Sequence, residues 1–316
     1  MPLRIDPAIH RRAKRRNIIN TWLIVSGLVA LLLLSSWLLF GITGIVWSFA
    51  LGAFVLIAGP RFSPAMILRL YRARPLGPRH VPDLWSVLEE LARRADLPAV
   101  PQLYYVASAN MNAFAVGRPQ HAAITITDGL LRRLNLRQLA GVLAHEVSHI
   151  ANEDIRVMAL ADIVNRLTGI LQTIGLFLLF FGLWQGGRAI LAAPVLILAP
   201  TVGALLQLAL SRAREYDADL EAAQLTGDPE GLASALATLE RRQGRMWESF
   251  VLPGARVPDP SLLRTHPPAK ERIRRLLELR GGRLARLETR EQLLTLPGTY
   301  KPVVRRPRFH VHGLWY

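Results

Sequence analysis

The stretch "LAHEVSHIANEDIR" at residues 143–156 holds the side chains best suited to chemistry. Residues four apart lie on the same face of a helix, so His145 and His149 can direct two imidazoles at one point. Glu146 lies beside them, and this HExxH spacing is typical of a zinc site with a glutamate base. The pattern therefore predicts a metal-binding helix. The alternative is that one histidine belongs to a polar network while the other faces solvent.

A catalytic zinc needs a third protein ligand and an open position for water. The chain has no cysteine, so His, Asp or Glu must supply that ligand. The metzincin spacing requires glycine at position 152 and histidine at 155, where this chain has Asn152 and Ile155. An intramembrane site is excluded too, because the HExxH helix is too short and too polar at its ends to cross a bilayer.

The later stretch "REYDAD" offers two acids that share a helical face, Glu215 and Asp219. Glu215 can reach the metal, while Asp219 can accept a proton from a ligand imidazole and fix its tautomer. The alternative is an ordinary solvated acidic helix, and spacing alone does not decide between the two.

Long apolar runs must position these residues. Residues 18–40 carry no charge and are long enough to cross a bilayer, and the run 42–59 follows after almost no loop. Together they predict a helical hairpin. A signal peptide fits less well, because a second apolar run follows at once and no convincing cleavage site is present.

Two further runs, 167–184 and 189–210, are joined by "QGGR". Polar residues precede the first, and the second contains Pro194 and Pro200. Both are predicted to span the membrane, for four spans in all. A pair that crosses only partly, or that is buried in protein, is the open alternative.

Basic residues in the flanking segments predict the orientation. The N-terminal arm and the segment after Gly59 are strongly basic, whereas the loop "GITG" has no charge and "QGGR" has one. We therefore expect a multi-pass protein of the cell's inner (plasma) membrane, with both termini and the metal site cytoplasmic. The net charge of +16 fits anionic lipid better than nucleic acid, because the arginines gather at the ends of apolar runs.

The remaining sequence predicts a small α+β domain. "DLWSVLEELARR" has the spacing of an amphipathic helix, and "PQLYYVAS", "NAFAVG" and "AAITIT" predict strands of a small sheet, antiparallel at its hairpin. The expected divisions are an N-terminal membrane hairpin (1–60), a first part of the domain (61–160), a second membrane hairpin (161–210), a second part of the domain (211–280) and a basic C-terminal tail without an assigned role (281–316).

Four pieces of the chain occur together in one known family: "NAFAVG", "HEVSHIANEDI", "SRAREYDAD" and "THPPAKERI". In their order and in their relation to the two apolar pairs, they resemble the HtpX-type membrane zinc metallopeptidases, which are related to the CaaX prenyl proteases. The resemblance implies a mainly α membrane protein with four transmembrane helices and a cytoplasmic α+β, gluzincin-like zinc protease domain with a small β-sheet.

The resemblance also implies roles for single residues. One Zn²⁺ per chain would be held by His145, His149 and Glu215, with Glu146 as catalytic base. Asp219 would be the partner of a ligand imidazole. The family's substrate-binding edge strand corresponds to Asn112, Ala113 and Phe114, and its "THPP" motif near the active site contains His266. Val116 and Arg264 depart from the family's usual residues, which puts side-chain preference in doubt.

The implied activity is hydrolysis of peptide bonds in unfolded or damaged membrane proteins, as in membrane protein quality control. The expected partners are polypeptide substrates and the lipid bilayer, without nucleic acid. His266 or Arg212 could stabilise the oxyanion, although His266 could equally be bonded within its own turn. The alternatives are a processing protease for defined, for example prenylated, C-termini, and a non-catalytic membrane scaffold with a structural metal.

Overall fold

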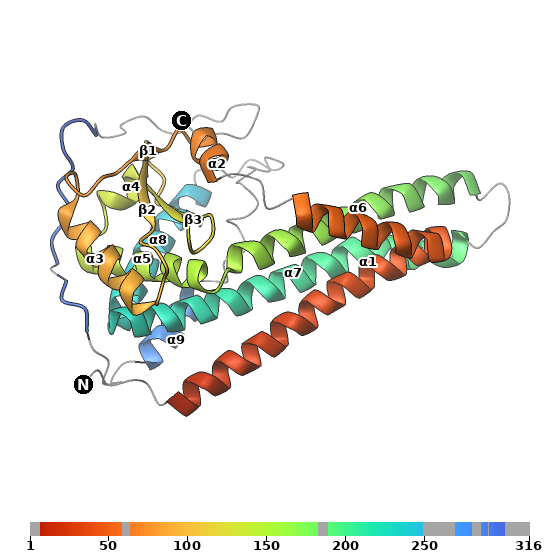
Figure 1. The fold of residues 1–316 in the computed structure, drawn as a ribbon, viewed down its shortest axis with the longest axis horizontal. Helices are drawn as coiled ribbons and strands as arrows, with labels where there is room; N and C mark the ends of the chain where they lie inside the picture. Colours follow the sequence, from red (N-terminus) through yellow and green to blue (C-terminus); the bar gives the residue numbers. More distant parts are fainter. Residues whose placement is uncertain are drawn as a thin grey trace. The chain divides into compact units, whose positions relative to one another are not determined.

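The structure is a computed structural model, and it describes residues 7–58, 64–182, 189–248, 269–279, 286–289 and 291–300. The chain divides into two compact units (Figure 1). Unit 1 comprises residues 1–11, 63–155 and 214–316, and unit 2 comprises 12–62 and 156–213.

Unit 2 is built from long apolar helices. They are α1 (Pro7–Ala58), α6 (Asp154–Gly182) and α7 (Ala189–Thr226), of which α6 begins and α7 ends in unit 1. Within the described residues, three helical stretches are long and apolar enough to cross a membrane: Thr21–Phe54, Asp154–Phe177 and Pro194–Thr226. The four expected crossings therefore stay a prediction.

The first of these stretches folds back on itself. Gly41 has φ 61° and ψ −145°, a backbone conformation that glycine adopts most easily. The hydroxyls of Ser36 and Ser48 lie 2.6 Å apart, whereas twelve residues of straight helix would separate them by about 18 Å. Helix α1 thus consists of two arms joined at Gly41, which agrees with the expected hairpin.

Helices α6 and α7 run antiparallel within unit 2. The side-chain amide of Asn165 donates to Gln207 Oε1 (3.1 Å), and the side-chain amide of Gln172 donates to the backbone carbonyl of Ile197 (2.8 Å). Pro200 interrupts the hydrogen bonds of α7 next to this contact. Proline lacks an amide proton, so the carbonyl of Leu196, which neighbours Ile197, cannot make its usual helical hydrogen bond to residue 200. The loop 185–188 expected between the two runs lies outside the described residues.

Unit 1 contains a small mixed sheet, which confirms the expected small β-sheet. The strands are β1 (Arg74–Pro75), β2 (Gln102–Val106), β3 (Ala113–Val116) and β4 (Ala123–Thr127), in the order β1-β2-β4-β3. The β3–β4 pair is antiparallel, whereas β2 and β4 pair in parallel. Among the described strands, β3 is therefore an edge strand.

Helices cover this sheet and form the core of unit 1 with it. They are α2 (Pro64–Leu70), α3 (Pro82–Arg94), α4 (Asp128–Leu131), α5 (Leu136–Ala151), α8 (Pro229–Glu248) and α9 (Ala269–Glu278). Fully buried side chains such as Leu88, Ile124 and Leu143 lie at the centre. Helices α5 and α8 approach so closely that a Cβ atom at Gly141 would lie 2.8 Å from the Leu232 backbone.

The described residues of 286–300, here the C-terminal segment, belong to unit 1 and contribute to its core. The Leu287 amide donates to the carbonyl of Thr226 (2.6 Å), and the Leu136 amide donates to the carbonyl of Gln292 (3.0 Å). Tyr300 is buried, with its ring centroid 4.8 Å from that of Tyr105. This part of the predicted tail is therefore an integral part of the domain.

Candidate metal centre

Helix α5 begins with a reciprocal cap that fixes where the HExxH residues lie. The Asn135 side chain accepts from the Gln138 amide, and the Gln138 side chain accepts from the Asn135 amide. Such a cap typically stabilises a helix by about 1 kcal/mol. The helix then enters the core, where His145 and Glu146 are buried.

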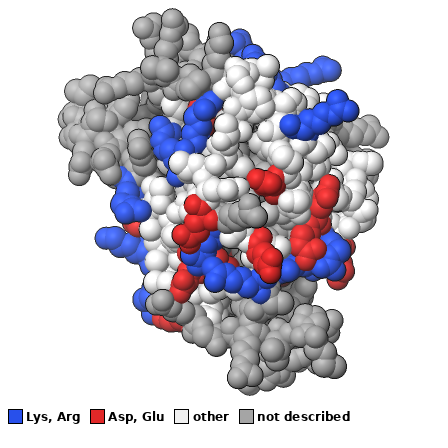
Figure 2. All heavy atoms as spheres, turned by 90° about the vertical axis from the view of Figure 1, so that its left-hand side faces the viewer, with Lys and Arg blue, Asp and Glu red and all other residues white. Residues whose placement is uncertain are grey.

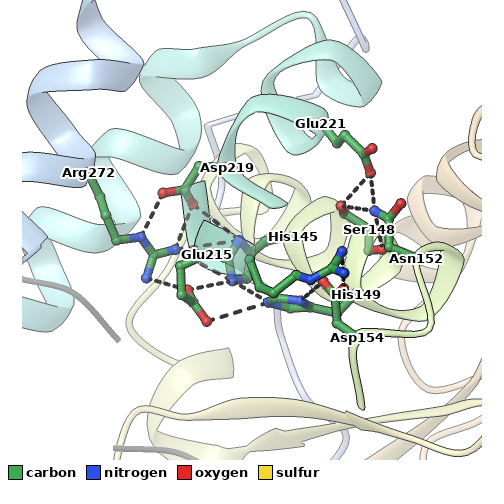
Figure 3. A network of polar contacts seen from close by, with 10 residues as sticks. His145, Ser148, His149, Asn152, Asp154, Glu215, Asp219, Glu221 and Arg272 are labelled. Atoms are coloured by element: carbon green, nitrogen blue, oxygen red, sulfur yellow. Dashed lines mark hydrogen bonds and ion pairs between the residues drawn. The ribbon is translucent and has the colours of Figure 1, made fainter. Parts of the chain in front are cut away.

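Three nitrogen and oxygen donors converge at this point (Figure 3). His145 Nε2 lies 3.1 Å from His149 Nε2 and 3.3 Å from Glu215 Oε2. Glu215 Oε1 lies 3.6 Å from His149 Nε2. The donor atoms of all three residues fall within 4.8 Å of one another, although Glu215 is 66 positions beyond His149 in the sequence.

The partner of His145 is a carboxylate that is held by a buried arginine. His145 Nδ1 lies 3.2 Å from Asp219 Oδ1. Arg272, on α9, donates two hydrogen bonds to Asp219 (2.6 and 2.7 Å) and lies 3.0 Å from Glu215 Oε2. Burial opposes the charged form of Arg272, but the hydrogen bonds and charge of Asp219 outweigh it and raise the pKa of the guanidinium.

His149 has an analogous partner in Asp154. Its Nδ1 atom lies 2.8 Å from Asp154 Oδ2, and Arg214 lies 3.0 Å from Asp154 Oδ1. Glu153 separates α5 from α6 with φ 52°, a left-handed conformation that ends the helix and lets the following residue fold back. This break places Asp154 against a histidine that lies only five residues earlier.

A third network joins α5 to α7 at Glu221, six residues beyond Glu215 on α7. Glu221 Oε2 accepts hydrogen bonds from the Ser148 hydroxyl and from the side-chain amide of Asn152, both at 2.6 Å. Ser148 is fully buried and follows His145 by three residues. Figure 3 shows this network beside the histidines. It fixes the two helices that carry the converging donors.

The charges around the site favour a cation. Burial alone would lower the pKa of His145, but Glu215 and Asp219 outweigh it and raise the pKa of the imidazole. The pKa of His149 is raised well above its usual value, against the effect of burial, by Asp154 and Glu215. Among the described residues of the site, four carboxylates, those of Glu146, Asp154, Glu215 and Asp219, face only two guanidinium groups, those of Arg214 and Arg272, which pair with Asp154, Glu215 and Asp219. The excess of negative charge would balance a bound cation.

The donor set fits a zinc ion. Bond lengths of about 2.0–2.1 Å in a tetrahedral site place neighbouring donors roughly 3.3 Å apart. The two Nε2 atoms are 3.1 Å apart, and each lies within 3.6 Å of a different oxygen of Glu215. If both Nδ1 atoms donate to carboxylates, both Nε2 atoms present lone pairs to each other at 3.1 Å. A cation between them removes that repulsion.

The predicted substrate strand lies beside the HExxH helix. Strand β3 contains Ala113 and the buried Phe114, with Asn112 just before it, and it packs beside α5. Arg212 is exposed. His266 lies outside the described residues, so the structure says nothing about its position.

Sequence reasoning missed Asp154, Arg214 and Arg272 as partners. The sequence did contain an indication for Asp154. An acidic residue shortly after HExxH can contact a histidine of that motif if the helix ends between the two residues. Arg272 also had such an indication, since it shares a helical face with the buried Leu276 four residues later. An arginine in an apolar stripe needs a buried acid, and Asp219 provides it.

Comparisons with known proteins show the family to which the chain belongs. Residues 78–280 match the model for peptidase family M48. A protease HtpX homolog of Acaryochloris marina is 38% identical over 278 residues, which cover 83% of this chain and 94% of that protein. The protease HtpX homolog of Pyrococcus furiosus is 35% identical over 276 residues, which cover 83% and 95%.

One solved structure, that of S. mikatae Ste24p, is similar with a TM-score of 0.48 and 20% identity, over 84% of this chain and 66% of that chain. The match to this peptidase family and the HtpX relatives, together with the apolar helices and the His-His-Glu cluster, define a membrane metalloprotease. The chain belongs to peptidase family M48.

Proposed function

We propose that this protein is a zinc-dependent endopeptidase in which His145, His149 and Glu215 hold the metal and Glu146 is the general base. The convergence of these three side chains carries the proposal, because one donor atom from each lies within 4.8 Å of the others. The two Nε2 atoms are 3.1 Å apart, close to the roughly 3.3 Å between neighbouring ligands of a tetrahedral site. Bound zinc would polarise the scissile carbonyl and make a water molecule acidic enough to attack it.

The residues of the chain have distinct parts in this chemistry. Glu146 takes the proton of the attacking water and delivers it to the departing amine. Asp219 and Asp154 hold the Nδ1 protons of the two histidines, so that both Nε2 lone pairs face the metal position. We keep His266 as a proposed donor to the developing oxyanion.

Substrate binding is proposed at the free edge of β3. The Thr127 amide donates to the Asn112 carbonyl, so in this antiparallel pair the backbone groups of Phe114 and Val116 face β4. Those of Ala113 and Ala115 face outward. An extended peptide can pair with these groups without a strict sequence requirement, which favours unfolded or damaged proteins as substrates.

The proposed location is the cytoplasmic face of the inner membrane, with four membrane crossings. Support comes from the basic segments that flank the first apolar region and from the reversal of α1 at Gly41. An even number of crossings between His149 and Glu215 leaves both donors on one side. A site at this face could act on unfolded membrane proteins in the same membrane.

The central test is Glu146→Gln in the full chain, purified in detergent with zinc restored. Casein cleavage should fall by about 10²–10⁴-fold because the base is lost, while zinc content should be unchanged. Glu89→Gln, on the exposed face of α3, is the matched control and should cleave normally. Full activity of Glu146→Gln would show that the base is wrongly assigned.

Two other results would redirect the proposal. Cleavage of prenylated peptides without cleavage of casein would identify a processing protease. A wild-type protein that retains zinc but cleaves neither substrate would be a scaffold with a structural metal.

A further inference from the structure

Helix α2 has an exposed apolar and basic surface that the peptidase site does not use. Met66 is 61% exposed and Leu70 is 58% exposed. Arg69 is exposed between them, and Arg72 and Arg74 are exposed just after the helix. We call these five residues the α2 surface. Apolar side chains interleaved with arginines form the pattern of a helix that lies in a membrane interface.

The end of α2 puts one of these arginines in an unfavourable backbone conformation. The Ala73 amide bonds to the Leu68 carbonyl, and the Arg72 amide bonds to the Arg69 carbonyl, which is the Schellman pattern that usually contains glycine. Arg72 instead has φ 50°. Glycine would suit the backbone better, so the chain carries a cationic side chain here at a cost in conformational energy.

The covalent chain limits how far α2 can be from a bilayer. The apolar helix α1 ends at Ala58 and α2 begins at Pro64. Six residue steps span at most roughly 20 Å. If α1 crosses a membrane, α2 must start within that distance of the point where α1 leaves it.

The inner face of α2 packs on the edge strand. Leu68 is buried in a cluster with Phe114 and Val116 of β3. Tyr71 follows the helix, and its ring centroid lies 4.9 Å from that of Phe114. Whatever holds the outer face of α2 therefore also positions β3.

We propose that the α2 surface lies in the headgroup region of an anionic bilayer and holds the edge strand beside the lipid. Met66 and Leu70 enter the interface while the arginines bind lipid phosphates. It follows, if the proposed peptidase function is correct, that the preferred substrates are extended segments that have just emerged from the bilayer.

The absence of cysteine makes the location of α2 measurable without a background of native thiols. Single variants Met66→Cys and Leu70→Cys carry a spin label in nanodiscs that contain phosphatidylglycerol. Glu89→Cys on the exposed face of α3, elsewhere in unit 1 (Figure 1), is the matched control. The labels at 66 and 70 should be accessible to oxygen and shielded from a nickel chelate, whereas the label at 89 should be accessible to nickel.

Two results of this measurement overturn the proposal. Nickel accessibility at 66 and 70 equal to that at 89 would place α2 in water. Shielding from both reagents would indicate a protein cover, either a second copy or a bound peptide. Because no cleavage is measured, the outcome does not depend on whether the peptidase assignment is correct.

A second measurement addresses the substrate class. Arg72→Gly removes a charge and relieves the positive φ, so the fold should be retained. Cleavage of a substrate anchored in anionic nanodiscs should fall roughly fivefold, the factor for one basic residue near an anionic surface, while casein cleavage and zinc content stay unchanged. If Arg72→Gly and wild type cleaved the anchored substrate at equal rates, the proposed contact of Arg72 with lipid would be overturned. If Arg72→Gly lost the same activity in nanodiscs of phosphatidylcholine alone, an effect of headgroup charge would be excluded.

The α2 surface differs in charge from the face of the molecule that Figure 2 presents. Figure 2 shows acidic and basic side chains interspersed on the face of the molecule that it presents. The α2 surface differs in composition, because its exposed polar side chains are all arginines. Anionic lipid is therefore a better match for it than an acidic-and-basic protein face.

Discussion

The two histidines of the metal centre are each held by a carboxylate that is itself held by an arginine. His145 contacts Asp219, which binds Arg272, and His149 contacts Asp154, which binds Arg214. The symmetry has a physical reason. A buried carboxylate that orients an imidazole keeps its own charge only if a cation compensates it.

The pair formed by His149 and Asp154 gives a prediction at this scale. Asp154→Ala should weaken zinc retention by about 10–100-fold, because the His149 ring loses the group that fixes its orientation. Asp154→Asn should lose less, since the amide oxygen can still accept from Nδ1. Competition with a chelator, followed by metal analysis, measures both variants. Retention equal to wild type in Asp154→Ala would show that this contact does not orient the ligand.

The two histidines could be proposed from the sequence because their spacing is local, whereas the ligand role of Glu215, 66 positions beyond His149, was implied by the family resemblance. HExxH places two imidazoles on one helical face whatever the rest of the fold does. The arginine partners could not be derived in this way. Arg272 reaches Asp219 only through the packing of α9 on the domain, and Asp154 reaches His149 only because of the break at Glu153.

Among the elements, strand β3 is the one proposed to bind substrate, because one of its edges is open among the described strands. Its residues alternate in function. Phe114 and Val116 are buried and pair with β4, whereas Ala113 and Ala115 direct their backbone groups outward. If substrate pairs with this edge as proposed, stability and recognition are carried by different residues of a strand of four residues.

This alternation can be tested with proline at neighbouring positions. Ala115→Pro removes an outward amide proton and no bond to β4, so KM should rise by roughly tenfold with little change in melting temperature. Val116→Pro removes a bond within the sheet and should lower the melting temperature clearly. An unchanged KM for Ala115→Pro would argue against pairing of the substrate with this edge.

The elements differ in how far the sequence could predict them. The apolar runs, the HExxH helix and the three longer strands follow from local patterns, and the reversal at Gly41 follows from "GITG" between two apolar runs. The parallel pairing of β2 with β4 was not predicted, because β3 lies between them in the sequence and local patterns carry no information about such pairing.

At the scale of the whole molecule, the domain is closed by ion pairs between distant parts of the chain. Arg137, near the start of α5, binds Asp228 through two hydrogen bonds and also contacts Glu230 and Glu291. Asp228 lies just before α8, and Glu291 belongs to the C-terminal segment. One arginine therefore joins three regions that are separated by up to 154 positions.

Acid should weaken this junction. Burial raises the pKa of Asp228, but the hydrogen bonds and charge of Arg137 outweigh it, so the pKa in the folded state lies below the usual value. The stabilisation is thus present above about pH 3.9, the ordinary pKa of aspartate, and is lost as the pH falls through the lower folded-state value. Asp228→Asn should reduce the free energy of unfolding at pH 7 by about 1–3 kcal/mol.

Thermal unfolding in detergent at several pH values tests this expectation. The difference between wild type and Asp228→Asn should shrink below about pH 4. Glu291→Gln is the control, since its carboxylate is 66% exposed and should contribute less than about 1 kcal/mol. A difference independent of pH would mean that the charge of Asp228 is not what stabilises the junction.

The C-terminal segment shows where prediction from sequence ended. The arginines and prolines of the tail 281–316 have no periodicity, yet Leu287 and Tyr300 in its described part are buried in unit 1. The contact of Tyr300 with Tyr105 joins residues 195 positions apart, and such a contact leaves no local pattern. Burial of single side chains in an irregular segment becomes visible only in the folded chain.

The order in which the chain is made bears on when it can cut. His145 and Glu146 are synthesised first, Glu215 follows after the second apolar pair, and Arg272 comes 127 residues after His145. At about 5–20 residues per second, the ribosome needs at least several seconds to supply the missing donor and its buried arginine. The nascent protein therefore contains its described apolar helices before it can assemble the complete candidate centre, so the proposed proteolysis can begin only after those helices have been made.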